Sequence, residues 1–352
     1  MDIAGGSLSV EEARGEFAPR VAYLNTASYG LPPRAAHEAV LAAERDRAAG
    51  LMSPVGVEAT VPVARAAFAR LTGVPVEWVS VGPQASYFVG LVAASLPSGA
   101  RVVVADGDFA SLVHPFLARD GLQVRSVPLD RVADEVSGGA DLVAVSVVQS
   151  ADGRIAPLAE VTAAARSAGA RVLLDATQAC GWLPVDASTA DFVVCGGYKW
   201  LMGPRGTAFF TVAPDALADV WPVAAGWFAS EDPWASLYAG QLRLAPDARR
   251  LDLSPAWPSW AGQAAALELL ERVGADAVLR HDVALANRFR AGLGLPPDDS
   301  AIVSLRVPDG TAARLAEHGV VVAERAGRLR ASFHLSTSED DVDRALSLLT
   351  TP

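Results

Sequence analysis

The chain has 352 residues, which is enough for one large domain with a satellite, or for two domains that each have a core. Apolar residues make up 51% and charged residues 20%, a globular composition, and the net charge of −11 without any basic run argues against binding to nucleic acid or acidic membranes. No segment has the ~20 apolar residues that span a bilayer, and the N-terminus has no apolar signal core.

Along the first two thirds of the chain, short apolar runs alternate with amphipathic segments. Helices are predicted at residues 32–49, 63–71, from about 85, and 158–168. Strands are predicted at residues 78–81, 102–104, 122–127, 142–148, 172–174, 192–195 and 207–212. This alternation is typical of a doubly wound α/β fold with a mostly parallel sheet.

The pattern changes near residue 260. Two longer helices are predicted at 260–273 and 276–293, and strands at 302–307, 319–322 and 329–333 are expected to form a small sheet. Ser338, with Asp341 three residues on, is expected to open the last helix through a capping box. The C-terminal part therefore has an α+β pattern.

The only cysteines, Cys180 and Cys195, lie in or beside apolar segments. Two such residues give no disulfide framework, so we interpret them as small buried side chains in a reducing compartment. Together with the missing signal core, this predicts a cytoplasmic protein.

A phosphate site is predicted where the strand at 78–81 breaks at Gly82-Pro83 and a helix begins near Ala85. A helix N-terminus presents free backbone N–H groups and the positive end of a dipole to an anion. Ala85 offers only its N–H, whereas Ser86 also offers a hydroxyl. The alternative is that the serine only caps the helix.

Two further strands each end in a side chain suited to catalysis. The strand at 172–174 leads to Asp175, and the strand at 192–195 leads through two glycines and a tyrosine to Lys199. Ligands of open α/β sheets bind at the carboxyl edge of the strands, so these two side chains are expected in one pocket. An amine and a carboxylate at a sheet edge suit pyridoxal phosphate (PLP), because the lysine forms a Schiff base while the carboxylate keeps the pyridine nitrogen protonated.

The D-A-T-Q motif, followed 24 residues after its Asp by Y-K-W-L-x-G-P-R-G, resembles the fold-type I PLP enzymes of the class V aminotransferase group. That group includes cysteine desulfurases, kynureninases, isopenicillin-N-epimerase-like proteins and ergothioneine-pathway carbon–sulfur lyases. The resemblance implies that Lys199 is the Schiff-base lysine, that Asp175 faces the pyridinium and that Gln178 bonds the phenolic oxygen of the ring. A structural aspartate and a solvated lysine are the alternative.

The same resemblance implies other contacts to the cofactor. Ala85 and Ser86 stand where the group has a phosphate-binding triplet, and Tyr198 stands where kynureninases have a phosphate-binding tyrosine. Phe109 stands where an aromatic ring stacks on the pyridine, although it is also interpretable as a core residue. Ser150 stands where the group often has an asparagine that touches the ring oxygen or the substrate.

Substrate contacts and a homodimer are implied as well. Arg330, in R-A-S-F, matches an arginine that grips the substrate α-carboxylate; without the resemblance it would be interpreted as a surface residue on an edge strand. Asn25 and Tyr29 match a segment at the active-site mouth, or else form a simple turn. The tryptophan-rich residues 213–259 are expected to reach the partner subunit, where Ser254 would contact the partner's phosphate.

The resemblance also implies a division of the chain. Residues 31–259 are expected to form the large PLP-binding domain and residues 260–352 the small C-terminal domain. Residues 1–30 are expected to complete the small domain and to reach the mouth of the active site.

Several reactions share one opening, in which an amino acid replaces Lys199 on the cofactor as an external aldimine and the freed amine removes the Cα proton. Desulfurases also need a mobile cysteine shortly before the carboxylate arginine, and residues 322–328 contain none. We therefore favour β-elimination from a cysteine S-conjugate-like amino acid, a carbon–sulfur lyase reaction, over transamination or epimerisation. A catalytically idle PLP-binding module and a non-PLP Rossmann enzyme are less consistent with the motifs.

Overall fold

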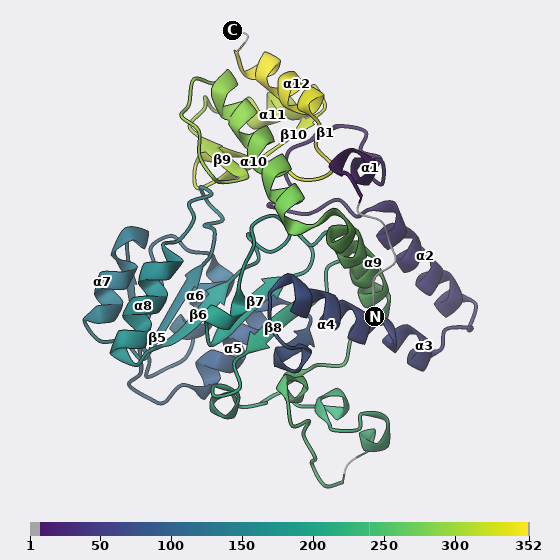
Figure 1. Cartoon of the computed structure of the whole chain (residues 1–352), viewed down its shortest axis with the longest axis vertical. Coiled ribbons are helices and arrows are strands. Elements are labelled where there is room, and N and C mark those ends of the chain that lie inside the picture. Colours follow the sequence, from purple (N-terminus) through teal and green to yellow (C-terminus); the bar gives the residue numbers. More distant parts are fainter. Residues whose placement is uncertain (1–7, 239, 351–352) are drawn as a thin grey trace.

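A computed structural model describes residues 8–238 and 240–350 of the chain. Its centre is a seven-stranded sheet in the order β2-β8-β7-β6-β5-β3-β4 (Figure 1). The strands are β2 (Val79–Gly82), β3 (Arg101–Ala105), β4 (Gln123–Val127), β5 (Leu142–Ser146), β6 (Arg171–Asp175), β7 (Phe192–Gly196) and β8 (Ala208–Val212). Strand β8 runs in the opposite direction to the other six strands, and the remaining pairs are parallel. The predicted α/β class with a mostly parallel sheet is confirmed.

Helices cover both faces of this sheet, and alternate strand residues supply the two cores. Leu174 and Val193 pack on the face covered by α4, α8 and α9, whereas Leu173 and Val194 pack on the face covered by α5 and α6. The helices in this part of the chain are α1 (Val10–Arg14), α2 (Arg34–Ala48), α3 (Pro54–Glu58), α4 (Thr60–Leu71), α5 (Ala85–Ser95), α6 (Ala110–Leu117), α7 (Val132–Ser137) and α8 (Leu158–Ala168).

The C-terminal part begins with α9 (Trp257–Val273) and α10 (Ala275–Gly292), which lead to a small antiparallel sheet of order β11-β12-β9. Its strands are β9 (Ile302–Leu305), β11 (Ala323–Arg325) and β12 (Arg328–Ser332), accompanied by α11 (Thr311–Glu317) and α12 (Glu339–Thr350). The Ser338 hydroxyl accepts a bond from the Asp341 N–H at 3.2 Å, as the predicted capping box requires. Within residues 8–238 and 240–350, no helix is both long enough and apolar enough to cross a membrane.

The N-terminal segment joins this C-terminal part. Strand β1 (Ala22–Tyr23) pairs in parallel with β10 (Val320–Val321), and Ala22 and Leu24 share a buried core with Phe289 and Phe333. The prediction that residues 319–322 belong to the small sheet is therefore wrong. The third strand of that sheet is β11, because the chain returns through a two-residue turn and pairs β11 directly with β12.

Strand β12 is the central strand of the small sheet, and its Arg330 is only 1% exposed. The interpretation of this arginine as a surface residue on an edge strand is therefore wrong. A guanidinium buried to this extent needs partners or a ligand, because burial of an unpaired charge is costly.

Candidate active site

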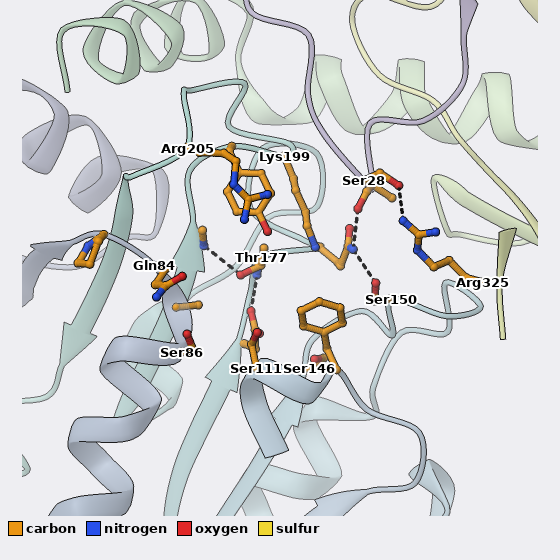
Figure 2. A pocket seen from close by; sticks show the side chains of 18 of the residues that line it. Ser28, Gln84, Ser86, Ser111, Ser146, Ser150, Thr177, Lys199, Arg205 and Arg325 are labelled. Carbon is orange, nitrogen blue, oxygen red and sulfur yellow. Dashed lines mark hydrogen bonds between the residues drawn. The ribbon is translucent and has the colours of Figure 1, made fainter. Parts of the chain in front are cut away.

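A cavity of about 520 Å³ opens at the carboxyl ends of the central strands, a size typical of small-molecule sites (Figure 2). Ser146, Asp175 and Gly196, the last residues of β5, β6 and β7, all line it. Most of the side chains singled out from the sequence line it too: Ala85, Ser86, Phe109, Ser150, Asp175, Gln178, Tyr198, Lys199 and Arg330. The predicted pocket at this sheet edge therefore exists.

Lys199 follows β7 and extends into the cavity. Its side chain is buried, and its Nζ makes no hydrogen bond to any residue that the structure describes, lying instead 4.9 Å from the centre of the Phe109 ring. Burial lowers the pKa of Lys199 to about 8; Asp175 opposes this shift and Arg330 adds to it. Lys199 is also the only lysine in the sequence, so the cavity holds the only side-chain primary amine of the protein.

Asp175 ends β6, the neighbour of β7, and is likewise buried. One of its carboxylate oxygens accepts a hydrogen bond from the Thr177 N–H at 2.8 Å. Burial raises the pKa of Asp175, while the bonds from Thr177 and the positive charge of Lys199 act in the opposite direction. The Thr177 hydroxyl in turn accepts from the Gly196 N–H at 2.9 Å, which ties the ends of the two strands together.

One end of the cavity is suited to an anion. Gln84 precedes α5 without capping it through its side chain, and the N–H groups of Ala85 and Ser86 make no hydrogen bond to a described residue. Tyr198 also lines the cavity, and the guanidinium of Arg205 lies 4.4 Å from the centre of its ring. Arg205 was not predicted as a site residue, although it belongs to the G-P-R-G turn of the motif.

Phe109 is 41% exposed and therefore not a core residue. The preceding Asp108 fixes its backbone, because the Asp108 carboxylate accepts bonds from the Phe109 N–H at 2.7 Å and from the Ser146 N–H at 2.9 Å. The ring is thus held at the edge of the sheet, beside the lysine amine. An aromatic face in this place excludes water without taking part in proton transfer.

Both the nitrogen and the oxygen of the Gln178 side-chain amide already form hydrogen bonds. Its Nε2 donates to the Ala27 carbonyl at 3.0 Å and to the Ser150 hydroxyl at 2.9 Å, and its Oε1 accepts from the Trp200 indole at 2.7 Å. A bond from Gln178 to a ring oxygen would therefore need one of these partners to be exchanged. Ser150 accepts from both Gln178 and Arg330, which leaves its own hydroxyl hydrogen available to a ligand.

The opposite end of the cavity contains two arginines. Arg330 donates through Nη1 to the Ser150 carbonyl at 2.5 Å and to the Ser150 hydroxyl at 3.1 Å, and through Nη2 to the Ser28 hydroxyl at 2.8 Å. A guanidinium has five N–H groups, so two remain unpaired, among them the buried Nε. Burial lowers the pKa of Arg330 to about 10. Arg325 also donates to the Ser28 hydroxyl, at 3.1 Å. Neither Arg325 nor Ser28 was predicted as a site residue.

Comparison with known proteins agrees with this geometry. Residues 123–304, more than half of the chain, match the family model described as aminotransferase class V. The chain belongs to the class V aminotransferase family. Isopenicillin N epimerase of Streptomyces clavuligerus is 29% identical over 96% of this chain and 97% of its own length. A probable cysteine desulfurase of Methanothermobacter thermautotrophicus is 24% identical over 69% of this chain and 71% of its own.

Solved structures share the fold of this class V aminotransferase-family chain. A cysteine desulfurase from Thermococcus onnurineus NA1 has a TM-score of 0.85 at 22% identity, covering 98% of both chains. The cystine C–S lyase C-DES has a TM-score of 0.84 at 23% identity, covering 94% of this chain and 97% of its own. The predicted family, the predicted fold class and the assignment as a PLP-dependent enzyme are confirmed.

The cavity of this family member is chemically suited to PLP, the confirmed cofactor. It combines the single lysine amine, a buried carboxylate on the neighbouring strand and free N–H groups at the start of α5. The chain therefore contains a nucleophile for the aldehyde, a proton-holding group for the ring nitrogen and an anion site for the phosphate.

Three predicted site residues do not line the cavity. Asn25 forms a backbone bridge with Ser332, and its Oδ1 is buried without a partner among the described residues. Tyr29 lies nearby, with its ring centre 5.8 Å from that of Tyr198, and Ser254 is exposed. Their proposed contacts to substrate, and to the cofactor of a partner subunit, stay predictions.

Proposed function

We propose that this protein removes the Cα proton of an amino acid and expels a leaving group from Cβ, as a carbon–sulfur lyase acting on a cysteine S-conjugate-like substrate. One observation carries the proposal: Lys199, Asp175 and Arg330 line a single cavity, and Arg330 keeps an unpaired N–H group at Nε. The absence of a cysteine from residues 322–328 argues against a desulfurase that proceeds through a persulfide.

In this proposal the residues divide between cofactor and substrate. PLP, when bound, supplies an electron sink for the electron pair released at Cα. Lys199 attaches the cofactor and then serves as the base, and a pKa of about 8, below the ordinary lysine value of 10.5, increases the neutral fraction of its amine near physiological pH. Asp175 holds a proton on the ring nitrogen. Arg330 binds the α-carboxylate through its unpaired N–H groups, which fixes the orientation of the substrate.

The remaining cofactor contacts belong to the same proposal. The N–H groups of Ala85 and Ser86, the Ser86 hydroxyl and the Tyr198 hydroxyl bind the phosphate, and Phe109 covers the ring. For the ring oxygen, two side chains are candidates: Gln178 after an exchange of partners, and Ser150 through its free hydroxyl hydrogen. Both side chains carry an N–H or O–H donor suited to that oxygen.

A panel of amino acids, assayed without any keto-acid acceptor, separates the possible reactions. Catalytic release of ammonia with a keto acid is the result expected for the lyase. One keto acid per active site, with bleaching of the cofactor, would instead identify a transaminase. Exchange of the Cα hydrogen with loss of optical purity, without ammonia, would identify an epimerase, an alternative favoured by the match to isopenicillin N epimerase over nearly the whole chain.

The control for this assay uses the single lysine. Lys199→Arg keeps the positive charge but offers no primary amine, so borohydride should no longer fix the cofactor to any side chain of the protein. Retention of borohydride-fixed cofactor on this variant would contradict the assignment of Lys199. A wild-type enzyme that neither releases ammonia nor exchanges the Cα hydrogen of any amino acid would contradict the proposed function.

The proposal also includes a cytoplasmic homodimer. Large apolar side chains are exposed in the irregular segment after β8, including Trp221 at 64%, Tyr238 at 91% and Leu242 at 68%. Exposed apolar side chains gathered in one segment are typical of an interface. Sedimentation of the wild type and of a Tyr238→Glu/Leu242→Glu variant checks this: we expect a dimer that the two charges dissociate, and a monomeric wild type would refute it.

A further inference from the structure

The substrate end of the cavity holds more positive charge than an α-carboxylate requires. The Nη2 atoms of Arg325 and Arg330 both donate to the Ser28 hydroxyl, at 3.1 and 2.8 Å, so the two guanidinium groups are at most two hydrogen-bond lengths apart (Figure 2). A hydroxyl is neutral and does not compensate either charge. Arg325 also contributes to lowering the pKa of Arg330, as expected for neighbouring cations.

The position of Arg325 is fixed by its hairpin. It is the last residue of β11 and pairs with Arg328 across a two-residue turn. Ala326 and Gly327 in that turn have φ values of 50° and 68°, the left-handed backbone that tight hairpin turns require. The Arg325 Nη1 also donates to the Glu324 carbonyl at 2.7 Å. The side chain is thereby held at the cavity that it lines, although Arg325 is exposed to solvent.

Neither of the two arginines is paired with a carboxylate of a described residue. Acidic residues number 40 against 29 basic ones, and many arginines form ion pairs, for example Arg65 with Asp252 at 2.6 Å. Among the described residues, no carboxylate lies within 4.0 Å of the guanidinium nitrogens of Arg325 or Arg330. Among the described residues, the two other buried arginines, Arg65 and Arg290, each pair with an aspartate. Within the same part of the chain, the buried Arg330 and its neighbour Arg325 instead have only neutral oxygens as hydrogen-bond partners.

The other two arginines of the cavity account for the phosphate and the α-carboxylate, so Arg325 has no role in the proposed reaction. Arg205 lies beside Tyr198 at the phosphate end, and Arg330 takes the α-carboxylate. We infer that Arg325 binds a second anionic group, carried on the side chain of the substrate. The inference rests on the proposed function and narrows it: the substrate is an amino acid with an acid on its side chain, such as a cysteine S-conjugate whose sulfur substituent ends in a carboxylate.

A matched pair of ligands tests the inference. S-carboxymethyl-L-cysteine and its amide, S-carbamoylmethyl-L-cysteine, have nearly the same size and differ in the terminal charge. Binding to the PLP-loaded enzyme is followed by the amplitude of the absorbance change of the cofactor on rapid mixing, before turnover. We expect the acid to bind about 10- to 100-fold more tightly than the amide, the difference expected for a charge-assisted hydrogen bond, and the preference to shrink with added salt.

Three variants complete the experiment. Arg325→Gln should remove most of the preference for the acid, whereas Arg330→Gln should weaken both ligands alike. Arg328→Gln is the matched control, because Arg328 pairs with Arg325 in the hairpin but bonds Ser304 and does not line the cavity. We expect it to leave both affinities unchanged.

The outcomes distinguish the inference from the function beneath it. Equal affinity of the wild type for acid and amide, or an Arg325→Gln variant that keeps the full preference, overturns the inference and leaves the proposed function standing. If neither ligand nor any other amino acid alters the cofactor spectrum, the proposed function fails and the inference fails with it.

Discussion

The two ends of the cavity are built in different ways. At the sheet end, Asp175 ends β6 and Lys199 follows the adjacent β7, and both belong to one 25-residue stretch of sequence. At the substrate end, Ser28 meets Arg325 and Arg330, which lie 297 and 302 residues further along the chain. The groups proposed for chemistry therefore stand on the rigid central sheet, whereas the groups proposed for recognition come from the two terminal parts of the chain.

Because the two ends have different proposed roles, variants at each end should have different effects on activity. Variants at the sheet end should affect the rate of the chemical step, because they alter the base or the electron sink. Variants at the substrate end should affect binding and the choice of amino acid. Each of the expected effects can break this distinction.

The largest effect is expected for Asp175→Asn. An amide cannot hold the ring nitrogen protonated as a carboxylate does, so we expect kcat to fall by about 10²- to 10⁴-fold while KM changes little. Steady-state kinetics and the cofactor spectrum measure this. Thr177→Val, which removes the bond to the Gly196 N–H but keeps the carboxylate, is the control and should lose much less. A variant Asp175→Asn with nearly normal kcat would show that the carboxylate is structural.

A smaller effect, on stability, is expected at His334, where the C-terminal part contacts the segment that carries Lys199. His334, which follows β12, lies 2.7 Å from a carboxylate oxygen of Asp282 through Nδ1 and 3.0 Å from the Trp200 carbonyl through Nε2. A carbonyl oxygen only accepts, so Nε2 carries the proton and donates to Trp200, the residue after Lys199. The C-terminal part thereby contacts the backbone of the segment that carries the lysine.

Replacement of this histidine should destabilise the fold. His334→Leu leaves the buried carboxyl of Asp282 without its partner, and we expect the free energy of unfolding to fall by about 3–5 kcal/mol in urea denaturation. The double variant His334→Leu/Asp282→Leu leaves no unpaired carboxyl and should recover part of the loss. If the double variant loses the sum of both single effects, the two side chains do not interact as a pair.

The sheet end was predictable from the sequence because its signals are local. Apolar runs that end in Asp175 and near Lys199, and a helix start at Ala85, correspond to β6, β7 and α5 in the structure. A further local signal was overlooked: a chain with 28 arginines and one lysine marks that lysine as the only side-chain amine. Composition alone would have singled it out.

The substrate end was not predictable in the same way. Strands β1 and β10 have two residues each, too few for a period to appear, so their pairing could not be read from the pattern. The burial of Arg330 depends on β11 and β9 on either side of its strand and on Ser28 from the N-terminus. Such contacts arise from tertiary packing, which single-sequence periodicity does not encode.

The smallest effect, and the most direct link between the two ends, concerns the pKa of Lys199. In cofactor-free protein the neutral amine reacts with an acylating reagent, so modification should rise with pH around a midpoint of about 8, below the usual range of lysine. Mass spectrometry of the peptide that contains Lys199 reports this reaction without interference from other lysines. A midpoint at the ordinary lysine value of 10.5 would mean that the amine is not desolvated as the structure shows.

Variants at either end should move that midpoint in opposite directions. Asp175 favours the charged amine, so Asp175→Asn should lower the pKa further, whereas Arg330 and Arg325 disfavour it, so Arg330→Gln and, to a lesser degree, Arg325→Gln should raise it. Because the folded state binds the lysine proton more weakly than the unfolded chain does, the stability of the cofactor-free protein should also rise as pH increases from about 8 to 10.5. A midpoint that responds to Asp175 but to neither arginine would mean that the substrate end does not act on the base, and the two ends would then be electrostatically independent.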